Sequence, residues 1–410
     1  MTTSIVFRNA SIVDGTRADR REGQHVRVED GVIREVSDRP IRAGSAESYD
    51  LAGRTLMPGL IDCHVHVLAA DVNLSRIVSD SLATLRALPI MRAMLDRGFT
   101  TVRDAGGADY GLALAVQQGL AVGPRLFVSG RALSQTGGHG DQRGRFDGSG
   151  VPARGYSGGV SRIADGVEAV RLAAREELRA GAHQIKVMVS GGVASPTDPI
   201  ANTQYSRDEL AAVVAEAEAA QTYVMAHAYT AKAARRAVEC GIRTIEHGNL
   251  VDDETAALMA RAGAYAVPTL VTYDALAEEG AALGLLPESV AKISDVRESG
   301  LRSLETFQRA GVKMAYGTDL LGEMQRHQST EFTIRARVLP PFEVIRSATT
   351  VAAEVLRQEG RLGVVAPGAV ADLLVVDGDP LKDLGTLLDQ GAHLRAIMQA
   401  GRFYKNQLTA

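Results

Sequence analysis

From about Pro58 to Gly363 the chain repeats one pattern: an apolar run, a glycine-rich or polar turn, and an alanine-rich amphipathic stretch. This alternation is typical of strand–helix units that build a parallel sheet. Eight such units in ~300 residues match the size of a (β/α)8 barrel, whose active sites lie at the C-terminal ends of the strands. Stretches such as 167–180 and 208–221 would be its outer helices. The candidate strands are 60–65, 101–104, 125–130, 184–190, 223–227, 244–246, 265–269 and 313–317.

Both ends of the chain instead contain short β-strand patterns. Near the N-terminus, Asp30-Gly31 separates two apolar runs and favours a tight hairpin. Near the C-terminus, the apolar run 373–376 is followed by an Asp-Gly-Asp-Pro turn, and further short runs follow it. We therefore predict an α/β protein with a (β/α)8 TIM-type barrel over residues 58–364. A smaller β-sandwich domain would be built from residues 1–57 and 365–410.

Charge and composition exclude several classes of protein. The 45 basic and 49 acidic residues give a net charge of −4, without the basic excess that nucleic acids or anionic membranes attract. Only Cys63 and Cys240 are present, so a disulfide framework or thiolate metal site is not supported. The sequence has no signal-peptide pattern and no run of ~18 apolar residues. We expect a cytoplasmic protein that binds neither nucleic acid nor membrane.

Candidate metal ligands fall at the ends of the predicted strands. His64 and His66 alternate at the end of the first strand, so both side chains point to the same face. Lys186 stands inside the fourth apolar run, where a bare ammonium would lose its hydration. His227 and His247 end the fifth and sixth strands.

Asp319 follows the eighth predicted strand and completes this set. Each residue alone has an ordinary explanation: a buried histidine often serves as a hydrogen-bonded core residue, a strand-end aspartate caps a helix, and a lysine extends to solvent. These explanations do not account for all six residues falling at matching strand ends. Imidazole and carboxylate are also ligands that zinc prefers.

These motifs together resemble the amidohydrolase superfamily over nearly the whole chain. They comprise Pro58-Gly59-Leu60-Ile61-Asp62, His64-x-His66, Lys186, His227, His247, Gly317-Thr318-Asp319, Pro367-Gly368 and Ala371-Asp372-Leu373. The resemblance implies two Zn²⁺ ions per chain, or other divalent ions, bridged by a hydroxide and by Lys186 carboxylated with carbon dioxide. It also implies that His64, His66 and Asp319 hold the more buried ion, and that His227 and His247 hold the more exposed one.

The residues after His227 narrow the range of reactions that the protein could catalyse. Mononuclear deaminases of the superfamily carry a glutamate a few residues after this histidine, whereas this chain continues Ala-Tyr-Thr-Ala-Lys. Together with Lys186, that difference favours hydrolysis of an amide or ester by a metal-bound hydroxide. Asp319 would take the proton of the hydroxide and pass it to the leaving amine.

Three further segments resemble one branch of the superfamily, which contains Xaa-Pro dipeptidases, N-acyl amino-acid carboxypeptidases and ochratoxin-type amidases. They are Gly-Gly-His-Gly-Asp at 137–141, His-Ala-Tyr at 227–229 and 317–324. The resemblance implies that His139 contacts the scissile carbonyl or the substrate carboxylate, and that Tyr229 contacts the carboxylate. A solvated or structural His139 and a Tyr229 that only packs remain alternatives.

We therefore predict a zinc-dependent hydrolase of dipeptides or N-acyl amino acids with a free carboxylate, acting on a small-molecule amide as a homo-oligomer. Hydrolysis of a cyclic amide, lactone or N-acyl sugar is an alternative, as is a non-catalytic scaffold. Arg103 could pair with a substrate carboxylate, with Asp104 or with Glu246. Asp62 could support a ligand or be structural. The glycine-rich segment 190–193 lacks the lysine and the spacing of a phosphate loop.

Overall fold

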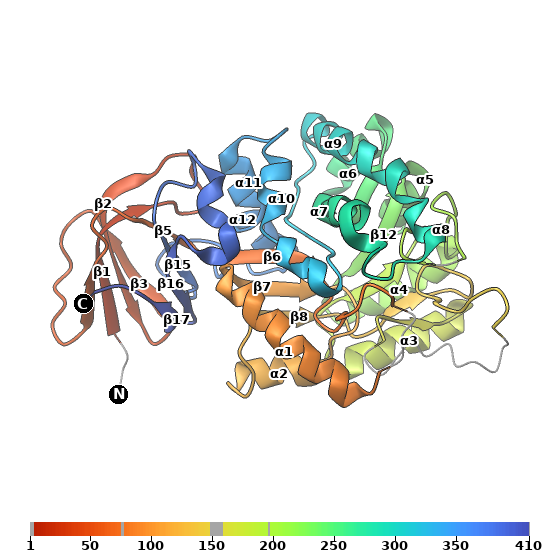
Figure 1. Cartoon of the computed structure of the whole chain (residues 1–410), viewed down its shortest axis with the longest axis horizontal. Coiled ribbons are helices and arrows are strands. Elements are labelled where there is room, and N and C mark those ends of the chain that lie inside the picture. Colours follow the sequence, from red (N-terminus) through yellow and green to blue (C-terminus); the bar gives the residue numbers. More distant parts are fainter. Residues whose placement is uncertain (1–3, 75–77, 148–158, 196, 410) are drawn as a thin grey trace. The chain divides into compact units, whose positions relative to one another are not determined.

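The computed structural model describes residues 4–74, 78–147, 159–195 and 197–409 (Figure 1). The chain divides into two compact units. The first comprises Met1–Asp62, Arg92–Thr101 and Phe332–Ala410, and the second comprises Cys63–Met91 and Val102–Glu331. None of the helices in the described ranges has both the length and the apolar character needed to span a membrane.

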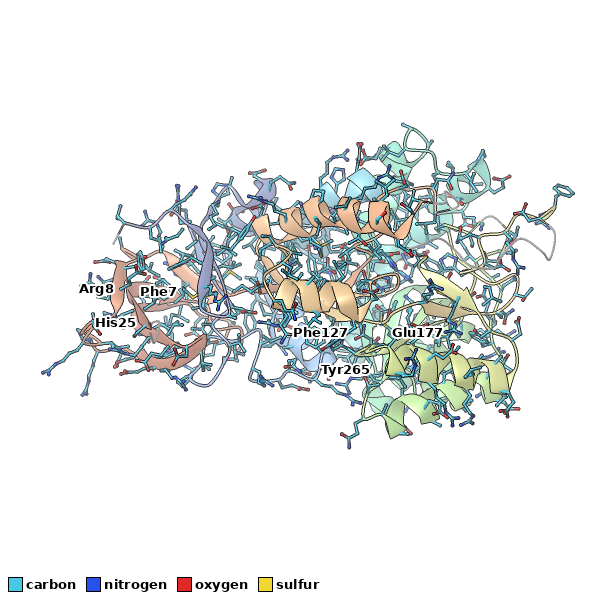
Figure 2. All side chains as sticks on the ribbon, turned by 90° about the horizontal axis from the view of Figure 1, so that it is seen from below. Phe7, Arg8, His25, Phe127, Glu177 and Tyr265 are labelled. Atoms are coloured by element: carbon cyan, nitrogen blue, oxygen red, sulfur yellow. The ribbon has the colours of Figure 1, made fainter. Side chains whose placement is uncertain are left out.

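The first unit contains one eight-stranded sheet that takes strands from both ends of the chain, coloured red and blue in Figure 1. Its order is β17-β16-β15-β5-β1-β2-β3, and β4 also pairs with β1. Phe7, labelled in Figure 2, lies in the core of this unit, where its ring contacts those of Tyr49 and Phe403. The strands are β1 (Ser4–Ile12), β2 (Arg21–Glu29), β3 (Val32–Ser37), β4 (Glu47–Asp50), β5 (Thr55–Pro58), β15 (Leu373–Val376), β16 (Leu394–Gln399) and β17 (Arg402–Asn406).

The predicted hairpin at Asp30-Gly31 joins β2 to β3, which are antiparallel. Asp30 has φ 49° and Gly31 has φ 79°, so both central residues adopt the left-handed conformation of a type I′ turn. Before this hairpin, β1 runs as one strand over Ser4–Ile12. Its register shifts between Phe7 and Ala10, next to the positive φ of Asn9.

The second unit contains a six-stranded parallel sheet of order β10-β9-β11-β12-β13-β14. A further sheet has the order β6-β7-β8, and its strands β6 and β7 each begin in the first unit and end in the second. Seven of the predicted strands are formed, and β9 and β10 are additional. The strands are β6 (Leu60–Val65), β7 (Phe99–Asp104), β8 (Arg125–Val128), β9 (Ala132–Ser134), β10 (Ser161–Ile163), β11 (Ile185–Met188), β12 (Val224–Thr230), β13 (Thr244–Leu250) and β14 (Tyr265–Val267).

The eighth predicted strand, 313–317, differs from the prediction. It forms only an isolated parallel bridge, between Met314 and Ala266 of β14. Its backbone is nevertheless hydrogen-bonded on two sides, because Ala315 N–H donates to Ala266 O and Cys63 N–H donates to Tyr316 O. The stretch is therefore extended, but its regular pairing is too short for a strand.

Helices follow most strands, as the alternation predicts, and α9 packs against β13 and α6. Local sequence fixes several helix starts: Ser206 and Glu209 form a reciprocal capping box at α4, and Asp252 caps α6. The helices are α1 (Asp80–Asp96), α2 (Tyr110–Gln117), α3 (Val167–Arg179), α4 (Arg207–Ala219), α5 (Ala231–Glu239), α6 (Asp253–Ala262), α7 (Leu270–Ala275), α8 (Pro287–Val290), α9 (Ile293–Ala310), α10 (Thr330–Arg335), α11 (Pro341–Ser347) and α12 (Thr350–Val355), with short helical turns at Leu276–Gly280, Gly322–His327, Leu384–Leu387 and Asp389–Gly391.

Candidate active site

All six predicted metal ligands line one cavity of the second unit. They come from the end of β6, from β11, β12 and β13, and from the turn after the extended stretch 313–317. The remaining wall is partly polar and partly apolar. The cavity is lined by His64, His66, Leu74, His139, Gly140, Gln142, Val160, Ser161, Lys186, Met188, Ala194, His227, His247, Asp319 and Leu321.

The closest group of potential ligand atoms belongs to His64, His66 and Asp319, whose donor atoms all lie within 4.8 Å of one another. Asp319 Oδ1 is 3.2 Å from His66 Nε2 and 3.5 Å from His64 Nε2. Burial alone would raise the pKa of Asp319, but the neighbouring histidines outweigh burial and hold this pKa well below its ordinary value. Two imidazoles and an ionised carboxylate at this spacing fit a divalent cation such as zinc.

Hydrogen bonds directed away from the cavity occupy one ring nitrogen of each of these histidines and leave the other nitrogen available to bind a metal ion. His64 Nδ1–H donates to Glu246 Oε2 (2.7 Å), and His66 Nδ1–H donates to Gly106 O (2.8 Å). His227 uses the opposite nitrogen, because its Nε2–H donates to Gly191 O (3.1 Å). Oxygen acceptors outside the cavity therefore fix the tautomers, which is the usual arrangement around metal-binding histidines.

His247 is held in the same way, with Nδ1 2.8 Å from Thr269 Oγ1. Its ring centroid lies 5.0 Å from that of His64 and 4.6 Å from that of His227. The rings of the four histidines consequently form a continuous group around one side of the cavity. Burial lowers the pKa of both His227 and His247 well below the ordinary value, so both imidazoles are neutral and can act as ligands.

Two of these residues have unusual backbone conformations. His247 has φ 72° and Asp319 has φ 52°, a region that residues other than glycine seldom adopt and that costs about 1–3 kcal/mol. On β13, strict alternation would send Glu246 and His247 to opposite faces, yet both contact His64. The left-handed conformation of His247 breaks the alternation and brings its ring to the cavity.

Lys186 lies on β11 with only 1% of its surface exposed. Burial lowers its pKa to about 8, although the carboxylates of Glu246 and Asp319 oppose this change. A substantial fraction of the side chain is therefore a neutral amine near pH 8. A neutral amine is a nucleophile, unlike the ammonium of an ordinary lysine.

The structure distinguishes between the three partners considered for Arg103. Arg103 Nη2 donates to both carboxylate oxygens of Glu246 (2.9 and 3.0 Å), and its Nε donates to Cys63 O (2.7 Å). Both members of this ion pair are completely buried. Burial alone would raise the pKa of Glu246, but Arg103 and His64 lower it to about 2.

Glu246 is thus a supporting residue that the sequence interpretation did not assign. It accepts hydrogen bonds from Arg103, His64 and Thr244, and so links the guanidinium to the first histidine. An available signal was the acidic residue inside an otherwise apolar strand, directly before His247. Asp62, considered for a similar role, is completely buried on β6.

The two residues predicted to contact substrate occupy different positions. His139 lines the cavity, and its ring stacks on His227 with centroids 4.1 Å apart. Tyr229 is buried beside the ligands, stacked on His247 at 5.1 Å. Its hydroxyl accepts a hydrogen bond from Tyr273 Oη at 2.9 Å. The structure therefore offers His139 directly to the cavity and holds Tyr229 in a packed aromatic group.

Comparison with known proteins gives consistent matches. The model of the amidohydrolase family matches residues 55–401. Ochratoxinase from Aspergillus niger is 35% identical over 366 residues, covering 85% of this chain and 75% of that protein. The crystal structure of an amidohydrolase is 59% identical with a TM-score of 0.97, covering 98% of this chain and 99% of that chain. That of a prolidase complexed with N-methylphosphonate-L-proline is 56% identical with a TM-score of 0.96, covering 99% and 100%.

We predict that Glu246→Gln destabilises the protein, because it leaves the buried Arg103 guanidinium without its counter-charge. Removing one partner of a buried pair costs about 3–5 kcal/mol. Calorimetry should show a clearly lower melting temperature.

Glu216→Gln is the matched control, because Glu216 pairs with Arg171 and Arg175 near the surface and its loss should cost only about 0–1 kcal/mol. Adding Arg103→Met to Glu246→Gln should recover part of the lost stability. Equal melting temperatures for the two glutamine variants would contradict the supporting role of Glu246.

Proposed function

Because the chain belongs to the amidohydrolase family, and is therefore a hydrolytic enzyme, we propose that it is a zinc-dependent amidase of dipeptides or N-acyl amino acids with a free carboxylate. The observation that carries the proposal is the cavity itself. Four histidines with outward hydrogen bonds, Asp319 and the buried Lys186 converge on it.

We propose that the cavity binds two zinc ions. His64, His66 and Asp319 would hold one ion, and His227 and His247 would hold the other. When bound, the ions would lower the pKa of a water molecule to about 7 and polarise the scissile carbonyl. Other divalent ions with similar ligand preferences fit the same residues.

Lys186 would bridge the two ions after carboxylation. Carbon dioxide would add to its neutral amine, forming a nitrogen–carbon bond as one proton leaves the nitrogen, and the product is an anionic carbamate. Burial and the lowered pKa of about 8 support this step, because the amine must be neutral to attack. Carboxylation also replaces a side chain that would repel metal ions when protonated with an anionic group that attracts them.

Asp319 would transfer the proton during hydrolysis. Its ionised carboxylate can accept a proton from the attacking water and then give it to the departing amide nitrogen. The hydrogen bonds of its backbone support this role, because Asp319 N–H donates to His64 O (2.8 Å) and so fixes the carboxylate beside the ligands.

The substrate proposal depends on the relatives and on His139 and Tyr229. The prolidase structure holds N-methylphosphonate-L-proline and is 56% identical to this chain, so dipeptides ending in proline are the first substrates to test. We propose N-acyl amino acids as the second class, and the 35% identity to ochratoxinase adds ochratoxin-type amides to the compounds worth testing. We propose that His139 meets the carbonyl or carboxylate of the substrate and that Tyr229 meets the carboxylate.

We also propose that the strands of the second unit close into the (β/α)8 barrel. Backbone hydrogen bonds join the six-stranded sheet to the sheet β6-β7-β8 at two places: His183 N–H, before β11, donates to Val128 O of β8. At the β14 edge, the stretch 313–317 bonds to both β14 and β6. We propose the corresponding domains as well: a barrel over 58–364 and a β-sandwich from 1–57 and 365–410. We also propose that the protein is a homo-oligomer.

The experiment that tests the function is hydrolysis of a panel by zinc-loaded protein. The panel contains Xaa-Pro and other dipeptides, N-acyl amino acids, cyclic amides, lactones and N-acyl sugars. Turnover of the first two classes supports the proposal. Turnover of only the cyclic or sugar substrates, or no turnover with two zinc ions bound, would contradict it.

We predict that Lys186→Ala loses most of the zinc and nearly all activity, because only the carbamate can bridge two ions. Short carboxylic acids added in solution should restore part of both. Metal analysis and turnover measure the two effects, with Lys232→Ala on the exposed surface of α5 as the control. A Lys186→Ala protein with two zinc ions and full activity would disprove the binuclear proposal.

We predict that Asp319→Asn keeps part of its zinc but loses turnover by more than ~100-fold, the lower range for acid–base catalysis. The amide retains an oxygen for the metal but cannot accept the proton. Steady-state kinetics at equal zinc content are the measurement. Activity within tenfold of the parent would assign Asp319 to metal binding alone.

We predict that capping the substrate carboxylate as an amide lowers kcat/KM by about 10- to 150-fold, because it removes a charge-assisted hydrogen bond worth roughly 1.5–3 kcal/mol. Tyr229→Phe should cause a comparable loss on the free acid but little further loss on the capped substrate, since both changes remove one contact. Equal penalties on both substrates would show that Tyr229 does not recognise the carboxylate.

A further inference from the structure

The glycine-rich segment after β11 packs directly against His139. A Cβ atom on Gly192 would lie 2.2 Å from Cε1 of the His139 ring. A Cβ atom on Gly191 would lie 1.9 Å from Pro199 O. Gly191 O also accepts the hydrogen bond from His227 Nε2. The two glycines are therefore required by close packing between this loop, His139 and a predicted metal ligand.

A chain of polar side chains from the same loop orients the His139 ring. His139 Nδ1 is 2.9 Å from Ser195 Oγ, and the Ser195 hydroxyl donates to Asp198 Oδ1. Gln204 Nε2 donates to Asp198 Oδ2 (2.8 Å), and Gln204 Oε1 accepts from His139 N–H (3.0 Å). Since the Ser195 proton goes to Asp198, the Ser195 oxygen is left to accept from His139 Nδ1–H. The Nε2 atom is left for the cavity.

Lys292, directly before α9, holds this loop from the other side. Its ammonium donates to Gly192 O (3.0 Å), Ser195 O (2.9 Å) and Asp198 O (2.8 Å). An ammonium has three N–H donors, and these contacts engage all of them with backbone carbonyls. A lysine bound in this way fixes the backbone of a loop through three points rather than forming a single surface ion pair.

We propose that Lys292 is a positioning residue for His139. By binding three carbonyl oxygens between Gly192 and Asp198, it fixes the loop from which Ser195 and Asp198 hold the His139 ring against His227. This inference rests on the proposed function in one respect, because it takes His139 to be the residue that meets the substrate. Neither Lys292 nor Ser195 lines the cavity, so the effect on the reaction is indirect.

The test uses Lys292→Met in the full-length, zinc-loaded protein. Methionine keeps the apolar stem and removes the three donors. We expect zinc content to be unchanged and kcat/KM to fall by ~10- to 100-fold, the effect of a misplacement of about 1 Å. Arg297→Met is the matched control, because Arg297 lies on α9 and pairs with Asp274 instead of the loop. Full activity of Lys292→Met, or an equal loss in the control, would overturn the proposal.

A double-mutant cycle determines whether the effect passes through His139. In a His139→Asn background, Lys292→Met should cause little further loss, because the residue that it positions is already gone. Losses that multiply would show that Lys292 acts by another route and would overturn the proposal.

Two measurements do not depend on activity. Hydrogen exchange should accelerate in Lys292→Met at the loop amides of Gly191 and Gln204, which donate to Asn202 O and Val189 O. Histidine-selective ¹⁵N NMR should show loss of the Nδ1–H state of His139, assigned with His139→Asn. Unchanged exchange and an unchanged His139 signal would overturn the proposal even if the parent protein hydrolysed none of the panel, which would separately disprove the proposed function.

Discussion

A completely buried guanidinium–carboxylate pair supports the candidate site. Arg103 and Glu246 would each be costly to bury alone, and the hydrogen bonds from Arg103 Nη2 to both Glu246 oxygens offset that cost in the interior. Glu246 then has a remaining lone pair for His64 Nδ1–H, which fixes the tautomer of the first histidine. The position and ring orientation of His64 consequently depend on a charge that lies on a different strand and does not line the cavity.

The other histidines follow the same physical rule with neutral acceptors. Backbone carbonyls of Gly106 and Gly191 and the hydroxyl of Thr269 engage one nitrogen each of His66, His227 and His247. Such contacts reduce the rotational freedom that a ligand would otherwise lose when it binds a metal ion. Lys186 differs, since burial alters its protonation rather than its orientation. The site therefore combines oriented imidazoles with a buried lysine whose pKa is lowered by desolvation.

The loop from Ser190 to Gln204 links the predicted metal ligand His227 to His139, which is predicted to contact the substrate. It contacts His227 through Gly191, His139 through Ser195 and Gln204, and the start of α9 through Lys292. Loops set the substrate preference of enzymes that share a scaffold and its central chemistry. In this chain the loop also carries Ala194 into the cavity wall, so one segment both holds the His139 ring and lines the cavity.

The sequence alone identified most of the local structure. Periodicity predicted seven strands of the two parallel-strand sheets, because a parallel strand buried on both faces is a continuous apolar run. The Asp30-Gly31 turn was predicted because few residues tolerate two successive positive φ angles. The motifs also identified His64, His66, Lys186 and their partners as one set, and the family was evident from their order.

Tertiary structure decided the long-range contacts of the site, which the periodicity of a sequence cannot show. The left-handed backbone of His247 breaks the alternation that separates it from Glu246, so both side chains reach His64. The partner of Arg103 was one of three alternatives until the fold brought Glu246 to it from 143 positions away in the sequence. Lys292 binds carbonyls about 100 residues distant, and backbone carbonyls have no signature in a sequence. Sequence specifies which groups are present, but long-range packing decides which of them share a proton, a charge or a hydrogen bond.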